Sequence, residues 1–167
     1  MLKFMFPFLN QANSSLKPIA FMFALLSIYH ASLVALRQID LKKVVAYSSV
    51  AHMGFVILGL FSFNLYGLLG SLLIMFSHGF VASALFFLVG FLYDRYGTKN
   101  LLDFGGLVTV NPLFVISFFL FSLANLSFPG TSNFVGEAFV LLGLTEVDVF
   151  SSLLSTFSIV LTASYTI

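Results

Sequence analysis

Three titratable side chains lie deep within long apolar stretches of this sequence. Glu137 is the acidic residue farthest inside such a stretch, and His52 and His78 lie near the middle of two others. A charge at membrane depth costs several kcal/mol by most estimates, so a buried ionisable group usually marks an ion or proton pathway. Imidazole gains and loses a proton near neutral pH, which suits a proton relay. We therefore interpret Glu137, His78 and His52 as candidate proton carriers.

Each of these residues also has a purely structural interpretation. Glu137 would then stay protonated near the membrane interface, and each histidine would stay neutral, hydrogen-bonded to a neighbouring helix. The proton-pathway interpretation is favoured because Glu137 follows an interrupted helix and because two histidines occur in other apolar stretches. Ser48 lies one helical turn before His52 and shares its face. His30 has no such neighbour in the sequence, and we interpret it as structural.

The apolar stretch that contains Glu137 is interrupted at residues 127–133 by the sequence SFPGTSN. Pro129 lacks a backbone donor, and Gly130 tolerates non-helical dihedral angles. Residues 112–126 would form roughly 22 Å of helix, so the break is predicted to fall inside the membrane. Asn133 is predicted to cap a second half-helix. Non-helical backbone at this depth needs cover from protein or a water-filled cavity, and broken helices are common at ion sites of transporters.

Five apolar stretches are long enough to supply the roughly 20 helical residues that cross a bilayer. Backbone groups in lipid must pair internally, so we expect helices rather than strands of an open sheet. The predicted fold is an all-α integral membrane unit of residues 18–167, preceded by an N-terminal segment of residues 1–17. The predicted spans are residues 18–36, 44–63, 66–93, 112–144 (broken near 127–133) and 147–165.

Charged residues gather in the connections between these spans. Five lysines and arginines lie on one side, here called side B: Arg37, Lys42, Lys43, Arg95 and Lys99. Because positively charged loops tend to stay inside, side B is predicted to be the cytoplasmic or matrix face. Residues 1–17 would then face the intermembrane space. We interpret residues 37–43 as a turn that sets this topology and contains a salt bridge, although Lys42 and Lys43 are also placed to help protons enter.

The composition excludes several classes of protein and site. Hydrophobic residues make up 60% of the chain and charged residues only 8%, whereas a soluble domain carries about 25% charged residues. The absence of cysteine excludes disulfides, thiolate metal sites and iron–sulfur clusters. A net charge of +1 gives no support for a nucleic-acid partner. No glycine-rich fingerprint for an organic cofactor occurs.

Several segments resemble, in sequence, order and spacing, the subunit-4 family of mitochondrial NADH dehydrogenase, respiratory complex I. They are LRQIDLKKVVAYSSVAHM at 36–53, SHGFVASALF at 77–86, LYDRY at 92–96, GGL at 105–107 and LANLSFPGTSNFVGE at 123–137. The similarity extends over residues 26–165. This family is one of the antiporter-like subunits of complex I.

The resemblance implies that protons pass along a hydrated row of Lys, His and Glu residues near mid-membrane. His52 and His78 match histidine positions on that row, and Glu137 matches the acid on the second broken helix, linked with the exit side. The resemblance also implies that NADH, FMN, iron–sulfur clusters and ubiquinone bind elsewhere in the complex. This chain is therefore expected to bind no cofactor or metal, and to lie in the mitochondrial inner membrane.

The family's earlier helices, with a Glu–Lys pair and a central lysine, have no counterpart in this chain. We therefore expect as partners the other membrane-arm subunits, a separate polypeptide supplying the missing helices, and lipids, but no nucleic acid. The expected function is proton translocation coupled to NADH:ubiquinone oxidoreduction, by a chain without its own redox centre. Three alternatives remain: a subunit of a multi-subunit cation/proton antiporter, a structural membrane anchor, and a truncated inactive copy.

Overall fold

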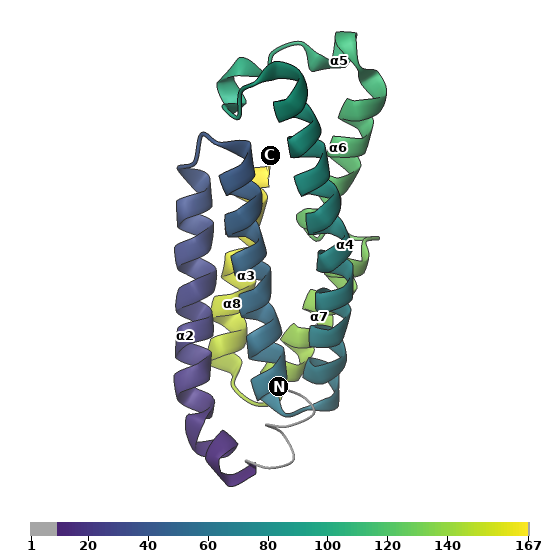
Figure 1. Cartoon of the computed structure of the whole chain (residues 1–167). Helices are drawn as coiled ribbons and strands as arrows, with labels where there is room; N and C mark the ends of the chain where they lie inside the picture. Colours follow the sequence, from purple (N-terminus) through teal and green to yellow (C-terminus); the bar gives the residue numbers. More distant parts are fainter. Residues whose placement is uncertain (1–9, 167) are drawn as a thin grey trace.

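The computed structural model describes residues 10–166, and the side chains of residues 15–166, as a bundle of helices (Figure 1). The described residues form no strand. Four of the helices, α2, α3, α4 and α8, are long and apolar enough to cross a membrane, and α6 and α7 are shorter apolar helices. This arrangement confirms the predicted all-α membrane fold. The elements are α2 (Asn10–Leu36), α3 (Leu41–Ser62), α4 (Leu65–Tyr96), η1 (Leu101–Asp103), α5 (Leu107–Val110), α6 (Pro112–Asn125), α7 (Ser132–Thr145) and α8 (Val149–Thr166).

The first helix extends farther toward the N-terminus than the sequence indicated. It begins at Asn10, within the expected separate segment of residues 1–17, of which residues 1–9 lie outside the described part of the chain. Pro18 lies inside the helix without ending it. A proline inside a helix removes a backbone donor and its ring crowds the carbonyl four residues earlier, but helices in membrane bundles tolerate this because neighbouring groups satisfy the freed carbonyl.

Helix α4 is longer than a membrane span requires. It has 32 residues, roughly 48 Å, and exceeds a hydrocarbon core of about 30 Å.

The fourth predicted span is broken as expected. Helices α6 and α7 contain 14 residues each, roughly 21 Å, so neither crosses a bilayer alone. Ser127 and Gly130 between them have positive φ angles of 57° and 105°. Thr131, rather than the expected Asn133, occupies the position before the first turn of α7 and makes no side-chain capping bond. The capping prediction for Asn133 was therefore wrong, because its side chain bonds across to another helix instead.

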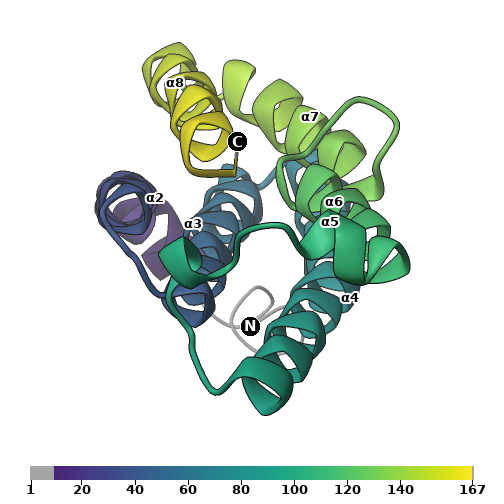
Figure 2. The same ribbon diagram turned by 90° about the horizontal axis from the view of Figure 1, so that it is seen from above.

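Close backbone contact holds α7 against α4, and this contact places the broken helix. Figure 2 shows α7 and α6 beside α4, with α2 and α3 adjacent to each other, and residue contacts support both pairings. A Cβ added to Gly70 of α4 would lie 2.7 Å from the backbone oxygen of Gly136 in α7. Only glycine allows two helices to approach this closely, a feature common where membrane helices pack.

Polar contacts join neighbouring turns at each end of the bundle. At the end called side B, Asp40 forms an isolated β-bridge with Asn100, and Lys43 Nζ lies 3.0 Å from Asp40 Oδ2. The salt bridge expected in this turn is therefore present. At the opposite end, the Asn64 amide donates to Glu146 Oε2 at 2.8 Å. The two charged ends thus lie about one helix length apart.

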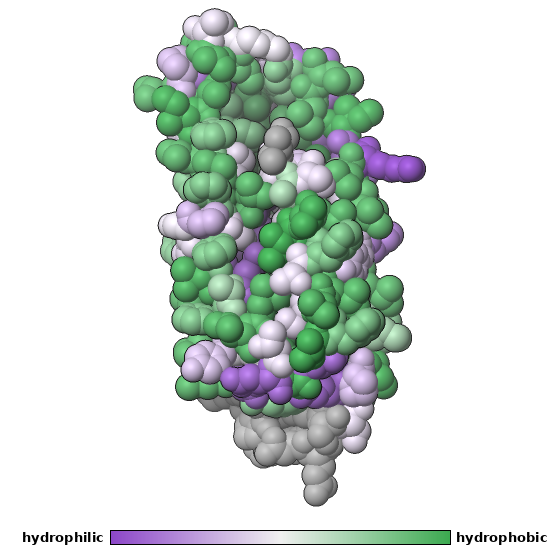
Figure 3. Space-filling model, turned by 180° about the vertical axis from the view of Figure 1, so that it is seen from behind, coloured by the Kyte–Doolittle hydropathy of each residue, from purple (hydrophilic) through white to green (hydrophobic). Residues whose placement is uncertain are grey.

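Large hydrophobic side chains cover much of the outer surface between these ends. Phe80 and Phe87 on α4 expose 75% and 76% of their surface. Figure 3 shows hydrophobic residues over most of one face and a band of hydrophilic residues near its lower end. A soluble protein rarely exposes so large an apolar area. The surface agrees with a multi-pass membrane protein surrounded by lipid or by other subunits.

Candidate functional site

A buried pair of titratable side chains joins α3 to α7. His52 Nδ1 lies 3.0 Å from Glu137 Oε1, and the two residues are 1% and 4% exposed. The other ring nitrogen, His52 Nε2, lies 3.0 Å from the backbone oxygen of Asn125, the last residue of α6. The structure thus brings together two of the three predicted proton carriers, and it places them at the end of the first half-helix.

The hydrogen bond to Asn125 determines how many protons the pair holds. A carbonyl oxygen only accepts, so His52 Nε2 must carry a hydrogen and donate it. The contact between His52 Nδ1 and Glu137 Oε1 then contains one proton, located either on the imidazole or on the carboxyl group. Carbonyls at a helix C-terminus also favour a positive charge nearby. The site can therefore exist as an ion pair or as a neutral pair with the same total number of protons.

The broken segment supplies further partners to this pair. Ser127, in the left-handed conformation, donates its hydroxyl to Glu137 Oε1 at 2.7 Å. The Asn133 side chain donates to the backbone oxygen of Ala124 at 3.0 Å and accepts a hydrogen bond from the Ser77 hydroxyl of α4. Buried backbone groups left without partners would be costly. Here side chains of α3 and α7 satisfy the carbonyls at the end of α6, so the break is stable inside the bundle.

The third predicted carrier, His78 of α4, stacks near His52 without bonding to it. The two ring centres lie 4.7 Å apart with the planes tilted by 38°. His78 Nε2 lies 3.1 Å from the Ser49 hydroxyl, which itself donates to the backbone oxygen of Val45. His78 Nε2 is therefore the donor of its bond. His78 Nδ1 is buried and has no hydrogen-bond partner within the described chain, which leaves it open to accept a hydrogen bond.

Two cavities lie near the buried pair, one beside Asn125, which bonds to His52, and one beside Glu137 itself. One of about 240 Å³ lies toward side B and is lined in part by Ser48, Asn125 and Tyr165. Asn125 Oδ1 and the Tyr165 hydroxyl are buried polar atoms without partners among the described residues. The rest of the lining is mainly apolar, so water would be held at these polar atoms, and the volume has room for several waters of about 30 Å³ each. The second cavity, about 470 Å³, has a mainly apolar lining between the break and α8, and Glu137 contributes to its wall.

Sequence reasoning found the three titratable residues but missed most of their partners. Asn125, Ser49 and Tyr165 were not singled out, because nothing in a single sequence shows which way a polar side chain points. Ser127 lay in the predicted break, where its contribution to Glu137 depends on the left-handed backbone. His30, interpreted as structural, is exposed on α2.

Comparisons with known proteins agree with this geometry. Residues 1–162 match the family described as NADH:quinone oxidoreductase/Mrp antiporter, TM. The chain is 48% identical over 167 residues to NADH-ubiquinone oxidoreductase chain 4 of Acanthamoeba castellanii, covering 100% of this chain and 34% of that protein. A chain of respiratory complex I from Thermus thermophilus with bound NADH is 30% identical, with a TM-score of 0.93, over 98% of this chain and 35% of that one. A chain of the Mrp complex from Dietzia sp. has a TM-score of 0.85 at 21% identity, over 90% of this chain and 28% of that one, and thus shares the fold.

These similarities confirm the resemblance carried by residues 36–53 and 123–137. The chain spans about a third of the length of the relatives it matches. The family match nevertheless covers nearly all of this chain, including His52, His78, the broken helix and Glu137. The chain belongs to the NADH:quinone oxidoreductase/Mrp antiporter transmembrane family.

Proposed function

We propose that this chain is part of the membrane arm of a respiratory complex I and carries protons there through His52, His78 and Glu137. The observation on which the proposal rests is the buried contact of 3.0 Å between His52 Nδ1 and Glu137 Oε1, beside an interrupted helix. Similarity to chain 4 of NADH-ubiquinone oxidoreductases supports the assignment to complex I rather than to another member of the family.

The His52–Glu137 pair is suited to respond to charge changes elsewhere in a complex by shifting its shared proton. Moving the shared proton from His52 to Glu137 converts an ion pair into a neutral pair. Electrostatic interactions inside a protein are screened less than in water, so a charge appearing nearby shifts this balance strongly. Ser127 donates its hydroxyl to Glu137 Oε1 at 2.7 Å and so helps to hold the carboxyl group toward His52. The shared proton would then move within the pair when the surroundings change, and net release or uptake requires a further group to exchange a proton with it.

His78 is the next group that could exchange a proton with this pair. Its unpartnered Nδ1 can accept a proton, but the ring contact with His52 is no hydrogen bond. Transfer therefore requires a rotation of one imidazole ring or an intervening water. The cavity at Asn125 and Tyr165 would supply such water from side B, because its unpartnered polar atoms can hold it. The route proposed thus runs from side B through this cavity to the buried groups.

The proposed setting of the chain follows from its relatives. We infer partners among the other membrane-arm subunits of such a complex. NADH, FMN, iron–sulfur clusters and ubiquinone would bind elsewhere in the complex, and this chain would bind none of them. The proposed location is the mitochondrial inner membrane, because the curated relatives with 48% identity are NADH-ubiquinone oxidoreductase chains.

A second candidate function is cation/proton antiport by a multi-subunit complex. It is favoured by the shared fold with a chain of an Mrp complex. A structural anchor is the third, and it would leave the buried pair without a role in proton flux. The described geometry favours proton transfer over anchoring, because a hydrophobic pair of similar shape would pack α3 against α7 without the cost of burying ionisable groups.

Purified native complexes containing this chain, placed in sealed vesicles, test the proposal. We expect the chain to migrate with an NADH-oxidising complex on a native gel, and mass spectrometry to find membrane-arm subunits beside it. We also expect NADH to drive proton movement without added sodium. Sodium-dependent proton movement in the absence of NADH would instead establish the antiporter function.

A further inference from the structure

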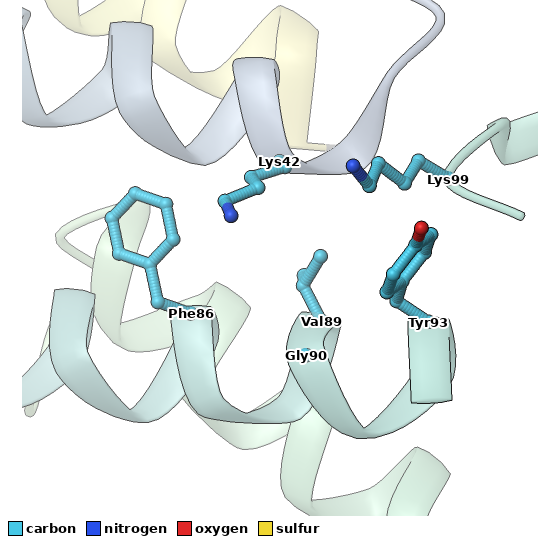
Figure 4. A pocket seen from close by; sticks show the side chains of 6 residues that line it. All are labelled: Lys42, Phe86, Val89, Gly90, Tyr93 and Lys99. Atoms are coloured by element: carbon cyan, nitrogen blue, oxygen red, sulfur yellow. The ribbon is translucent and has the colours of Figure 1, made fainter. Parts of the chain in front are cut away.

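A small basic hollow lies at side B, away from the buried pair. It has a volume of about 100 Å³ and lies between the first turn of α3 and the last turns of α4 (Figure 4). Figure 4 shows two lysine side chains reaching it from one side and aromatic and aliphatic side chains of α4 on the other. Its lining residues are Lys42, Phe86, Val89, Gly90, Tyr93 and Lys99.

Backbone hydrogen bonds hold the two lysines over this hollow. The Leu41 amide donates to the Lys99 carbonyl at 3.0 Å, and the Leu101 amide donates to the Ile39 carbonyl at 3.0 Å. Gly97, with φ of 69°, ends α4 and lets the chain turn back toward α3. Two loops far apart in the sequence are therefore fixed side by side, and Lys42 and Lys99 converge because the backbone positions them.

The positive charge of the hollow is not neutralised by the described part of the chain. Neither Lys42 nor Lys99 has a carboxylate oxygen within the 4.0 Å that defines an ion pair. The nearby carboxylate of Asp40 is already paired with Lys43 at 3.0 Å. Lys99 Nζ instead lies 4.4 Å from the centre of the Tyr93 ring, which fixes the ammonium at the rim. Two unneutralised ammonium groups beside one hollow favour an anionic ligand.

The floor of the hollow is apolar and open. Phe86 and Val89 form it, and a Cβ added to Gly90 would have no atom within 4 Å. The hollow lies at the side-B end of α3 and α4, two helices long and apolar enough to cross a membrane, where we expect lipid headgroups to meet water. A free anion would gain nothing from the apolar floor, whereas a phosphate joined to hydrocarbon chains would bury them there.

We propose that this hollow binds the phosphate group of an anionic phospholipid. Lys42 and Lys99 donate to the phosphate oxygens, and the half-buried Phe86 contacts the start of the acyl chains. Basic clusters at the inner membrane face attract anionic lipids in this way. None of the proposed proton carriers lines this hollow, so the proposed lipid site does not depend on the proposed proton transfer.

The test compares phospholipid retained by purified native complexes that carry different variants of this chain. Complexes are equilibrated with phosphatidylglycerol in phosphatidylcholine, washed in detergent and measured by lipid mass spectrometry. The double variant Lys42→Gln, Lys99→Gln should bind phosphatidylglycerol about thirtyfold more weakly than the unaltered chain, because each such lysine contributes about fivefold. Lys43→Gln, which removes the lysine paired with Asp40, is the matched control and should change retention little. Equal retention in the double variant and the control would overturn the proposal.

A charge-conserving variant keeps the test valid if the double variant fails to assemble. Gly90→Leu fills the floor while leaving both lysines in place, and it should also lose the retained lipid. Adding inorganic phosphate then distinguishes a lipid from a free ion. At matched ionic strength, phosphate should release no more phosphatidylglycerol than sodium chloride does. Specific release by phosphate, or full retention in Gly90→Leu, would contradict binding of a lipid phosphate.

Discussion

His52 Nδ1 lies 3.0 Å from Glu137 Oε1, although 85 positions separate the two residues in the sequence. The contact crosses from α3 to the half-helix that follows the break. Asn125, whose carbonyl accepts from the second nitrogen of His52, fixes the imidazole in one orientation. The pair therefore has one shared proton and a defined geometry between its two groups.

Replacing His52 by Phe tests the structural importance of both hydrogen bonds. Phenylalanine fills a similar volume but leaves the Asn125 carbonyl and the Glu137 carboxyl short of a partner. Each buried group left unpaired costs about 1–3 kcal/mol, so the purified complex should unfold at a lower temperature and move fewer protons. His30→Phe, on the exposed side of α2, is the control and should alter neither quantity. Identical thermal unfolding of the two variants would refute the assigned bonds.

Ser127 combines a hydrogen bond with a left-handed backbone, and two substitutions separate these contributions. Ser127→Ala and Ser127→Gly both remove the hydroxyl that donates to Glu137. Because φ is 57°, glycine adopts this backbone without strain, whereas alanine, like the native serine, adopts it at a cost of about 1–2 kcal/mol. We expect equal losses in proton translocation but a higher unfolding temperature for the glycine variant. Unequal translocation would mean that the backbone, and not the hydroxyl, sets the behaviour of Glu137.

The contact between α4 and α7 should be sensitive to a single methyl group. Gly70→Ala forces a Cβ to within 2.7 Å of the backbone of Gly136 and Val140, so the half-helix must move away. Overpacking of this kind costs about 1–3 kcal/mol. Gly79→Ala, on the same helix but with open space around it, should instead stabilise the chain by about 0.5–1 kcal/mol. Thermal unfolding of the assembled complex distinguishes the two, and a tolerated Gly70→Ala would contradict the close approach.

Two tyrosines separate a role in water binding from a role in packing. Tyr165 has a buried hydroxyl without a partner, whereas the Tyr29 hydroxyl donates to the Leu154 carbonyl at 2.6 Å. Tyr165→Phe should slow proton translocation with little change in stability, because it removes a group proposed to hold water. Tyr29→Phe should reduce stability by about 0.5–1.5 kcal/mol with unchanged translocation. Proton translocation rates in vesicles and unfolding temperatures of both variants distinguish the two roles. An unchanged translocation rate in Tyr165→Phe would exclude the proposed route.

The general fold could be predicted because membrane helices leave a strong signal. Apolar stretches of sufficient length, separated by charged turns, have few alternatives in a bilayer. Pro129 and Gly130 likewise revealed the broken helix, since both residues act through the backbone. The start of α2 was predicted too late, because proline is favoured in the first turn of a helix and Pro18 instead lies inside α2.

The contacts of the site depended on three-dimensional packing that a single sequence does not reveal. Glu137, His52 and His78 were recognisable because ionisable residues are rare at membrane depth. Asn133 was misassigned as a cap, since an Asn near a helix start more often bonds to that helix than across the bundle. Its actual bonds to Ala124 and Ser77 depend on how α7 packs against α4 and α6.

The most direct test of the central claim is the number of protons translocated per NADH oxidised when Glu137 is replaced by Gln. Glutamine has nearly the same shape and can still bond to Ser127, but it cannot take up the shared proton. We predict an assembled complex in which this ratio falls below that of the unaltered complex. An unchanged ratio in the assembled Glu137→Gln complex would contradict the role given to the His52–Glu137 pair.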